Sequence, residues 1–499
     1  MADQFLVLIV LFPLFVGLLI PIIAYFNKSV VWPLAILSLI GSFWAVFNTA
    51  TQLLKLDPSS SISYYLGNWM APFGIEYVVD RFNIMVLFAI ICVSLLTTIF
   101  AKQVIEKELG DNAANFYSLF LLFITGLLGI TITGDAFNLY VLLEIASLTS
   151  YGLIALGRGR ALVATFNYLI MGSMGACFYL LGVGYLFIKT GTLNMDQLYD
   201  VLPLLFDSKA VLVGFVFIIL GMWVKMAFFP LHSWLPNAYS LAPTAAACLM
   251  APLMTKVSVY VMIRFMLNVF STEYVYSVLT INNIIVIMSS IAIIAGSIYA
   301  LSQKNLKKML TFIIVAEIGY MVGGVWTGHV DGIRGAIYHI TADAFMTLCL
   351  FMAVGCIVYR VGNDKLESLK GIFKKMPITM ICFLVGGFSV IGIPPTCGFF
   401  SKWYLISGAF NSGAWYFIIA LIISSLINAV LFFRIIEIGF FGAMSNEKPD
   451  YKSLQSIKFN EVPINMWLPL VIVSMILIIL GIYTNEIMTN FILNIVPMM

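Results

Sequence analysis

The stretch VLVGFVFIILGMWVKMAFFPLHSWLP, residues 211–236, decides which fold this chain can adopt. Fourteen uncharged residues precede Lys225, and Pro230 follows it five positions later. A run of this length and apolarity is typical of a helix that crosses a lipid bilayer. A charged side chain at that depth costs about 3 kcal/mol or more, so intramembrane lysines are rare and usually mark a pathway for ions or protons.

Similar segments fill the rest of the chain. Of its 499 residues, 62% are hydrophobic and 10% are charged, whereas a soluble protein carries about 25% charged residues. Together with a mean hydropathy of +1.04, these values exclude a soluble globular protein. We predict an all-α polytopic membrane protein. About fourteen transmembrane helices are expected, at 5–26, 30–54, 82–101, 115–133, 137–156, 161–188, 210–229, 244–268, 277–301, 308–327, 333–359, 378–410, 414–441 and 464–485.

The basic residues are distributed unevenly along the chain. Sixteen lysines and arginines lie in or beside loops that follow odd-numbered helices. Five lie on the other side: Lys55, Lys189, Lys209, Arg264 and Arg334. The positive-inside rule then places the odd loops in the cytoplasm and both termini on the extracytoplasmic side. We expect a multi-pass protein of the cell (inner) membrane.

Prolines break two of the expected helices. Pro230 and Pro236 interrupt the seventh, and Pro394 with Pro395 interrupts the twelfth, because proline removes a backbone donor. Paired broken helices are typical of transporters built from inverted repeats. We predict two inverted five-helix repeats, helices 4–8 and 9–13. The expected divisions are 1–110, a three-helix segment; 111–270 and 271–441, the two repeats; and 442–499, a loop and the last helix.

Glu144, in AFNLYVLLEIASLTSYGLIALG, is the natural partner for Lys225. Apolar surroundings lower the pKa of a buried lysine, and a nearby carboxylate raises it. When the two effects nearly cancel, the lysine can gain and lose a proton near the working pH. Two structural alternatives exist. Lys225 could extend its amine to water along an apolar stem, or the pair could simply lock two helices together.

Further titratable residues occupy other expected helices. Lys256 stands in APLMTKVSVYVMIRF, where Arg264 and the helix end offer an anchoring role instead. Lys402 follows the broken twelfth helix and is a candidate terminal site. His232 lies between two prolines, where it could bond freed carbonyls, relay protons or belong to the core.

The eleventh expected helix contains a further pair. His339 and Asp343 are four residues apart in GAIYHITADAFMTLCLF and share one helix face. Histidine is the side chain that most readily titrates near neutral pH. Glu317, in the tenth expected helix, is either a relay or a packing residue.

No motif for a cofactor or metal is present. The seven cysteines form no CxxC pair and fall in apolar segments, and the three histidines are scattered. Neither a GxGxxG motif nor a phosphate-binding loop occurs. We expect no cofactor, no metal and no nucleic-acid partner.

Three stretches resemble a known family. They are KMAFFPLHSWLPNAYSLAPTAAACLMAPLMTKVSVYVMIRF at 225–265, LLEIASLTSY at 142–151 and GIPPTCGFFSKWYL at 392–405, with IGYM at 318–321 in addition. The chain resembles the antiporter-like subunits shared by complex I, energy-converting membrane hydrogenases and Mrp-type Na+/H+ antiporters. The likeness spans nearly the whole chain and is greatest for the D-type antiporter subunit.

The resemblance implies fourteen helices and a line of polar residues at mid-membrane. It carries over Glu144 with Lys225 as a coupled pair, Lys256 as a central relay and Lys402 as a terminal site. Many members place His or Lys near the positions of Asp343 and Thr347, so His339 or Asp343 is expected to link Lys256 with Lys402.

These observations favour a proton-translocating subunit of a larger membrane complex. Its expected partners are other membrane subunits, the lipid bilayer and protons, with Na+ as a further candidate. Two assemblies fit: a Mrp-type antiporter and a redox-driven pump, such as a hydrogenase or complex I-like enzyme, whose other chains would hold the redox centres. A stand-alone solute carrier and a structural anchor are further classes, and the spaced titratable groups argue against both.

Overall fold

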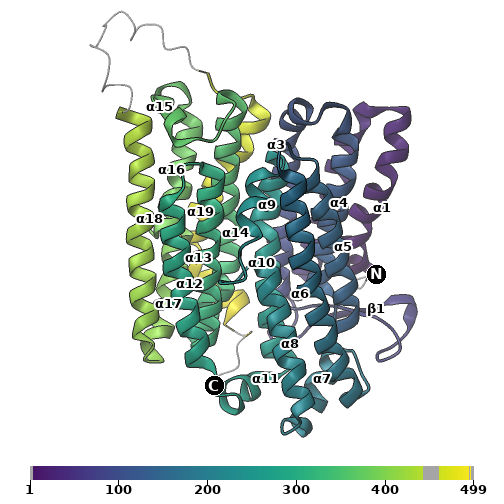
Figure 1. The fold of residues 1–499 in the computed structure, drawn as a ribbon. Coiled ribbons are helices and arrows are strands. Elements are labelled where there is room, and N and C mark those ends of the chain that lie inside the picture. Colours follow the sequence, from purple (N-terminus) through teal and green to yellow (C-terminus); the bar gives the residue numbers. More distant parts are fainter. Residues whose placement is uncertain (1–3, 442–459, 494, 496–499) are drawn as a thin grey trace, which may run out of the picture.

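A computed structural model describes residues 4–441, 460–493 and 495, and they form a bundle of long, roughly parallel helices (Figure 1). Thirteen helices in this part are long and apolar enough to cross a membrane. They are α1 (Gln4–Phe26), α2 (Val31–Leu53), α3 (Arg81–Glu108), α4 (Ala113–Ile132), α5 (Ala136–Ala155), α6 (Ala161–Thr190), α8 (Lys209–Met226), α10 (Thr244–Asn268), α12 (Asn282–Ser302), α13 (Leu306–Trp326), α14 (Val330–Val361), α18 (Trp415–Phe441) and α19 (Ile464–Ile482).

A broken helix provides a fourteenth crossing, which confirms the predicted number. The helix α16 (Pro377–Ile391) ends at Gly392, whose φ of 93° lies in the left-handed region that suits glycine. After the two prolines, α17 (Cys397–Asn411) continues across. The seventh expected helix is broken in the same way. It consists of α8, which stops before Ala227 (φ 61°), and the short α9 (Leu235–Leu241).

The helices alternate in direction, so the turns gather at two ends of the molecule. Figure 1 places the α3–α4 and α14–α16 connections at its upper end. The lower end holds the segment between α2 and α3, the α6–α8 connection and the last described residues. Most of the loop lysines and arginines belong to the upper end, and Lys55, Lys189 and Lys209 belong to the lower one. Lys448, Lys452 and Lys458 lie outside the described residues.

A small hairpin covers part of the lower end. The strands β1 (Ile62–Tyr65) and β2 (Glu76–Val79) pair antiparallel, with Ile62 opposite Val79. The helix α7 (Met195–Val201) joins this cap, because Asn194 donates a hydrogen bond of 2.9 Å to Glu76.

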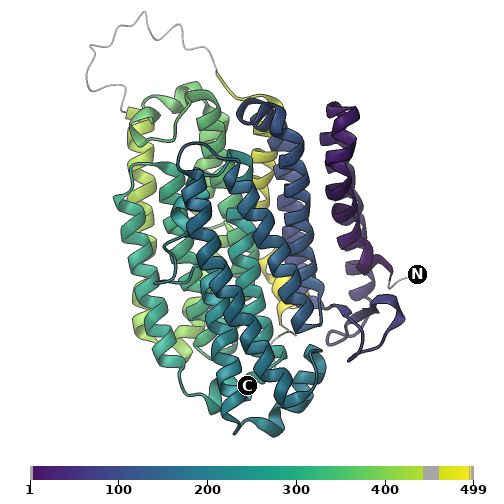
Figure 2. The same ribbon diagram turned by 45° about the vertical axis from the view of Figure 1, so that its right-hand side comes forward.

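The centre of the bundle is formed by α10, α13 and α14, whose residues are almost all buried. The helix α10 packs against α14, α3 and α8. In both views α1 lies at the edge of the bundle (Figures 1 and 2), whereas α19, drawn in yellow, packs with one side against other helices and leaves Leu468, Met475 and Ile482 exposed on the other. Contacts of α19 with α3, α14, α16 and α17 agree with this placement. The central helices therefore hold their polar side chains away from the outer surface.

Candidate functional site

Glu144 on α5 and Lys225 on α8 face each other, as predicted. Lys225 Nζ lies 3.7 Å from Glu144 Oε1, and the side chains of Lys225 and Glu144 are 1% and 27% exposed. Lys225 also donates a hydrogen bond of 2.7 Å to Ser147, one turn after Glu144 on α5. The pair is therefore asymmetric, because the lysine is enclosed while the carboxylate reaches the outer surface of the chain.

The position of Lys225 depends on a close approach of α6 and α8. A side chain on Gly221, one turn before Lys225, would come within 2.7 Å of the Gly175 carbonyl oxygen. Only glycine permits that contact. The helix then ends within two residues of Lys225 because Ala227 turns to positive φ, so the lysine sits in the last turn of a half-helix.

Lys256 on α10 and Asp343 on α14 form the most enclosed of the pairs. Lys256 Nζ lies 2.9 Å from Asp343 Oδ2, and both side chains are 2% exposed. Lys256 also donates to Thr347 Oγ1 at 3.3 Å, and Thr347 in turn donates to Asp343 Oδ1 at 2.8 Å. A buried charge pair persists only when further hydrogen bonds satisfy its remaining atoms, and Thr347 supplies one of them.

His339 on α14 is bonded on both sides. Its Nε2 lies 2.6 Å from Glu317 Oε2 on α13, and its Nδ1 lies 2.8 Å from Ser401 Oγ on α17. His339 and Glu317 are fully buried. The ring of Tyr320, one turn from Glu317, meets the imidazole edge to face at 5.7 Å.

Lys402 on α17 has no carboxylate within ion-pair distance among the described residues. Its ammonium donates to the carbonyl oxygens of Val390 and Ile391 at 2.6 and 3.4 Å, and to Ser425 on α18 at 3.0 Å. Val390 and Ile391 are the last residues of α16, whose carbonyl end carries a partial negative charge. The Tyr320 ring lies 5.0 Å from the amine.

These groups lie on adjoining helices. The order runs from α5 through α8, α10 and α14 to α13 and α17: α5 meets α8 at the Glu144–Lys225 pair, and each of the other helices packs against the next. Asp343 and His339 share a face of α14, as the spacing predicted, but they bind different partners. Asp343 belongs with Lys256, while His339 belongs with Glu317 and Ser401.

His232 lies apart from these pairs. Its ring stacks on Phe229 at 5.0 Å and lies beside Tyr299 and Phe312. Its Nδ1 atom is buried and has no hydrogen-bond partner in the described part of the chain. These contacts fit packing within the break better than a relay.

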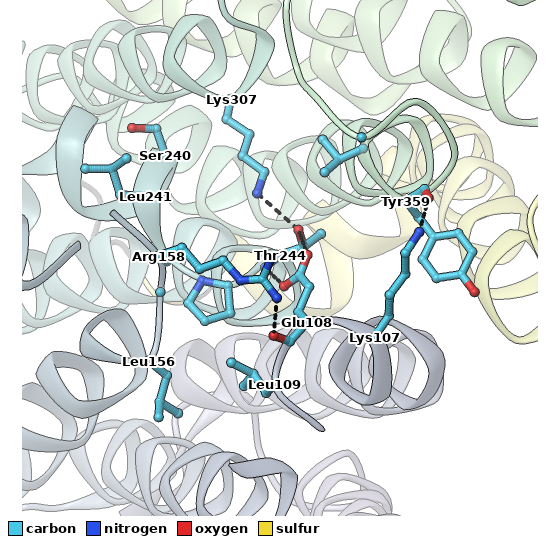
Figure 3. A pocket seen from close by; sticks show the side chains of 15 residues that line it. Lys107, Glu108, Leu109, Leu156, Arg158, Ser240, Leu241, Thr244, Lys307 and Tyr359 are labelled. Atoms are coloured by element: carbon cyan, nitrogen blue, oxygen red, sulfur yellow. Dashed lines mark hydrogen bonds between the residues drawn. The ribbon is translucent and has the colours of Figure 1, made fainter. Parts of the chain in front are cut away.

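A second polar cluster lies at the upper end, in a cavity of about 390 Å³ (Figure 3). Glu108, at the end of α3, accepts hydrogen bonds from the Thr244 backbone N–H and hydroxyl at 2.9 and 2.6 Å. Lys307 donates to the Thr244 hydroxyl at 3.1 Å, and Arg158 donates to the Glu108 carbonyl at 2.9 Å. Lys307 is buried, and its bond joins α13 to α10 and, through Thr244, to α3.

Sequence reasoning missed the hydroxyl groups beside the charges. Ser147 follows Glu144 by three residues, Thr347 follows Asp343 by four, Tyr320 follows Glu317 by three, and Ser401 immediately precedes Lys402. Residues three and four apart are neighbours on a helix. A search for hydroxyls at these spacings would have found three of the four. Within the described residues, no group of three or more His, Cys, Asp or Glu side chains could hold a metal ion.

Comparisons with known proteins agree with this architecture. The sequence profile of a family described as NADH:quinone oxidoreductase/Mrp antiporter, transmembrane, matches residues 133–428. An NADH-quinone oxidoreductase subunit N of Desulforudis audaxviator is 39% identical over 97% of this chain and 97% of its own length. A putative antiporter subunit mnhD2 of Staphylococcus haemolyticus is 32% identical over 79% of this chain and 78% of its own.

Two solved structures resemble the whole chain. One is a chain of the membrane-bound sulfane sulfur reductase, an archaeal respiratory membrane complex, with a TM-score of 0.87 and 27% identity over 99% of this chain and 98% of that one. The other is a chain of the Mrp complex from Dietzia sp. DQ12-45-1b, with a TM-score of 0.86 and 21% identity over 99% and 97%. At that identity the second likeness concerns the fold alone.

Proposed function

The chain belongs to the NADH:quinone oxidoreductase/Mrp antiporter family of membrane subunits, and on that premise we propose that it moves protons along its line of buried charged side chains. It is an antiporter-like subunit of a multisubunit ion-transporting complex. The proposed relay consists of Glu144, Lys225, Lys256, His339 and Lys402, with Glu317 and Asp343 as intermediate groups.

The Lys256–Asp343 pair is the observation on which the proposal depends. Lys256 lies in the first proposed repeat (111–270) and Asp343 in the second (271–441), so this contact joins the two halves. Both side chains are almost inaccessible to solvent. Burying charged groups at this depth costs free energy that apolar side chains in the same places would not, which favours a functional role for the pair. A proton that reaches Lys256 has Asp343 at 2.9 Å as its next acceptor.

Beyond Asp343 the proposed relay turns along α14. His339 lies one helical turn away and is bonded to Glu317 on one side and Ser401 on the other. Imidazole can accept a proton at one nitrogen and release it from the other. Ser401 adjoins Lys402, which we propose as the terminal site. Hydroxyls such as Ser147 and Thr347 both donate and accept, so they can support transfer between neighbouring charges.

The family relatives fit two kinds of assembly. The mnhD2 proteins are named as putative antiporter subunits, in line with a D-like role in a Mrp-type Na+/H+ antiporter. A second candidate is a membrane subunit of a redox-driven complex, with other chains holding the redox centres. The similarity to subunit N of an NADH-quinone oxidoreductase favours it, because that match extends over 97% of both chains.

We further propose an orientation in the cell membrane. The upper end, with most of the loop lysines and arginines, would face the cytoplasm, and both termini would lie on the extracytoplasmic side. Other membrane subunits are the expected partners, and protons, with Na+ as a further candidate, are the expected cargo.

The proposal is tested by replacing Lys225 with Ala in the complex purified through this chain and reconstituted into vesicles. Proton movement, followed with an entrapped pH dye, is expected to fall to the background of empty vesicles. Lys189→Ala is a matched control, because it removes a lysine that lies at the end of α6, outside the relay. Proton movement by the Lys225 variant at the rate of this control would refute the role of Lys225.

A further inference from the structure

A polar cavity lies at the lower end of the molecule, away from the relay. Its volume is about 190 Å³, and it lies among the segment before β1, the start of α3, the end of α4, α7 and the last turns of α10. Asp80, Asp196, Arg264 and Asn268 line it. The Asn268 Oδ1 atom is buried and has no hydrogen-bond partner in the described residues.

Arg264 and Asp80 close the inner side of this cavity. Arg264 Nη1 and Nη2 bond the two Asp80 carboxylate oxygens at 2.5 and 3.0 Å, a two-point contact that fixes both side chains. Asp80 also caps α3, because it accepts hydrogen bonds from the N–H groups of Phe82 and Asn83. The pair is largely buried, with the side chains of Arg264 and Asp80 12% and 25% exposed.

A polar face of α10 runs from this pair toward Lys256. Arg264 Nε donates to the Tyr260 hydroxyl at 3.1 Å, and that hydroxyl donates to the Thr131 carbonyl oxygen at 2.9 Å. Lys256, Tyr260 and Arg264 are spaced by four residues, so they lie along one side of the helix. With a rise of 1.5 Å per residue, Tyr260 and Arg264 stand about 6 and about 12 Å from Lys256 along the axis.

The same face has no such groups in the opposite direction. The positions four and eight residues before Lys256 are Pro252 and Cys248, both buried. The next polar group on this face is Thr244, at the upper cluster, about 18 Å away. The polar side chains nearest to Lys256 on this face of α10 therefore lie toward the lower end of the molecule.

A carboxyl group suited to proton exchange stands at the rim of the cavity. Asp196 on α7 lines the cavity with one side and is exposed to water on the other. Partial burial raises its pKa, and the negative charges of Glu76 on β2, Asp80 and Asp200 add to the rise while Arg264 opposes it. Tyr65 on β1 is a further titratable neighbour, and the charge of Glu76, followed by partial burial and the charge of Asp196, raises its pKa.

We propose that this cavity is a gated proton port that joins Lys256 to the extracytoplasmic side through Tyr260, with Arg264 as its gate and Asp196 as its outer exchange group. The inference rests on the proposed relay through Lys256 and adds a second outlet to it, in the first half of the chain. A fixed arginine repels protons in a narrow pore, and it keeps its charge at every working pH. With the Asp80 contact formed, the port is closed.

The test compares Arg264→Gln with Arg264→Lys in the reconstituted complex without a driving reaction. A unit charge about 12 Å from Lys256, at an effective dielectric constant of about 20, alters proton occupancy there about tenfold. Passive proton influx is therefore expected to rise about tenfold in the Gln variant, whereas the Lys variant keeps the charge and is expected to remain near the parent. Arg334→Gln, at the same end but outside the cavity, is the matched control.

Two combined variants identify the route. Adding Lys256→Met to Arg264→Gln is expected to abolish the leak, and adding Asp196→Asn is expected to lower it and to weaken its dependence on extracytoplasmic pH. A leak that persists without Lys256, or Arg264→Gln vesicles as tight as the control, would overturn the port. If the port fails while Lys225→Ala is still inactive, the proposed relay stands. If Lys225→Ala transports normally, the relay itself fails.

A chemical probe covers the case in which Arg264→Gln does not assemble. Ser61 lines the cavity, and the Ser61→Cys variant leaves Arg264 and Asp80 in place. In a Cys177→Ser background, a membrane-impermeant cationic thiol reagent is added from the extracytoplasmic side of the driven complex, in which the Arg264–Asp80 contact has to open for the port to serve as an outlet. Proton movement is then expected to slow at least about twofold, by the same electrostatic reasoning. Full modification of the thiol introduced at position 61 with unchanged transport would overturn the port.

Discussion

Replacing Asp343 with Asn tests whether the contact between Lys256 and Asp343 carries both stability and transport. Asparagine has nearly the same shape, and its carbonyl oxygen can still accept the hydrogen bond from Thr347, so the substitution removes the charge and little else. At 2.9 Å between Lys256 Nζ and Asp343 Oδ2, the attraction is about 6 kcal/mol at an effective dielectric constant of about 20. The desolvation of both groups offsets most of it.

The loss of one partner is expected to be costly because the other charge stays buried. Asp343→Asn and Lys256→Met should each destabilise the chain by about 3–5 kcal/mol. The double variant should recover about 2–3 kcal/mol relative to the sum of the two losses. Proton movement should be absent in all three variants, since each lacks a member of the relay.

Both quantities can be measured on the purified complex. Thermal unfolding of the parent and the three variants gives the stability differences for the double-mutant cycle. Vesicles with an entrapped pH dye give the rate of proton movement. The exposed pair Lys28–Asp111, with side chains 68% and 96% exposed, provides a control cycle in which the coupling should be indistinguishable from zero. Strictly additive losses at Lys256 and Asp343 would show that the two charges do not interact. Parental transport by Asp343→Asn would remove Asp343 from the relay.

Three further experiments test other parts of the proposal. Lys225→Arg should abolish proton movement in vesicles, because arginine does not release its proton at working pH; parental rates would end the case for a titrating lysine. His339→Ala should reduce proton movement at least about tenfold, which corresponds to a barrier to proton transfer that is higher by about 1.4 kcal/mol. His329→Ala, at the α14 N-terminus, should leave proton movement unchanged. Equal rates in the two variants would show that the relay does not pass through His339. Single cysteines in place of Asn305 and Ile372, in a Cys92→Ser, Cys177→Ser background, should react with an impermeant reagent only from the cytoplasmic side, and labelling from outside would invert the proposed orientation.

Much of the fold follows from the sequence because the bilayer restricts the choice of structure. An apolar segment of about 20 residues can only be a helix there, and Pro230 and Pro394 mark both breaks directly. The hairpin β1–β2 was not predicted. It lies outside the apolar segments, and its short strands pair across a loop of ten residues, Leu66–Ile75, that has no repeating pattern.

The candidate site was predictable in its residue types but not in its pairings. Lys225, Lys256 and Lys402 could be identified because each is a charged residue within a long apolar segment, where charge is rare. The spacing of His339 and Asp343 placed them on one face, yet it could not show that α13 approaches one residue and α10 the other. That depends on how α14 packs between its neighbours, which helical periodicity does not specify.

The ammonium of Lys402 has three hydrogens and three acceptors, the carbonyls of Val390 and Ile391 and the hydroxyl of Ser425. A neutral amine keeps only two hydrogens, so discharge of Lys402 leaves one acceptor without its donor. Two of those acceptors are the last carbonyls of α16, next to the Gly392 joint with α17. Each proton that leaves Lys402 would then loosen the joint, and each arrival would tighten it. Protonation of the single Lys402 amine would thereby control the relative movement of the two half-helices α16 and α17, one proton at a time.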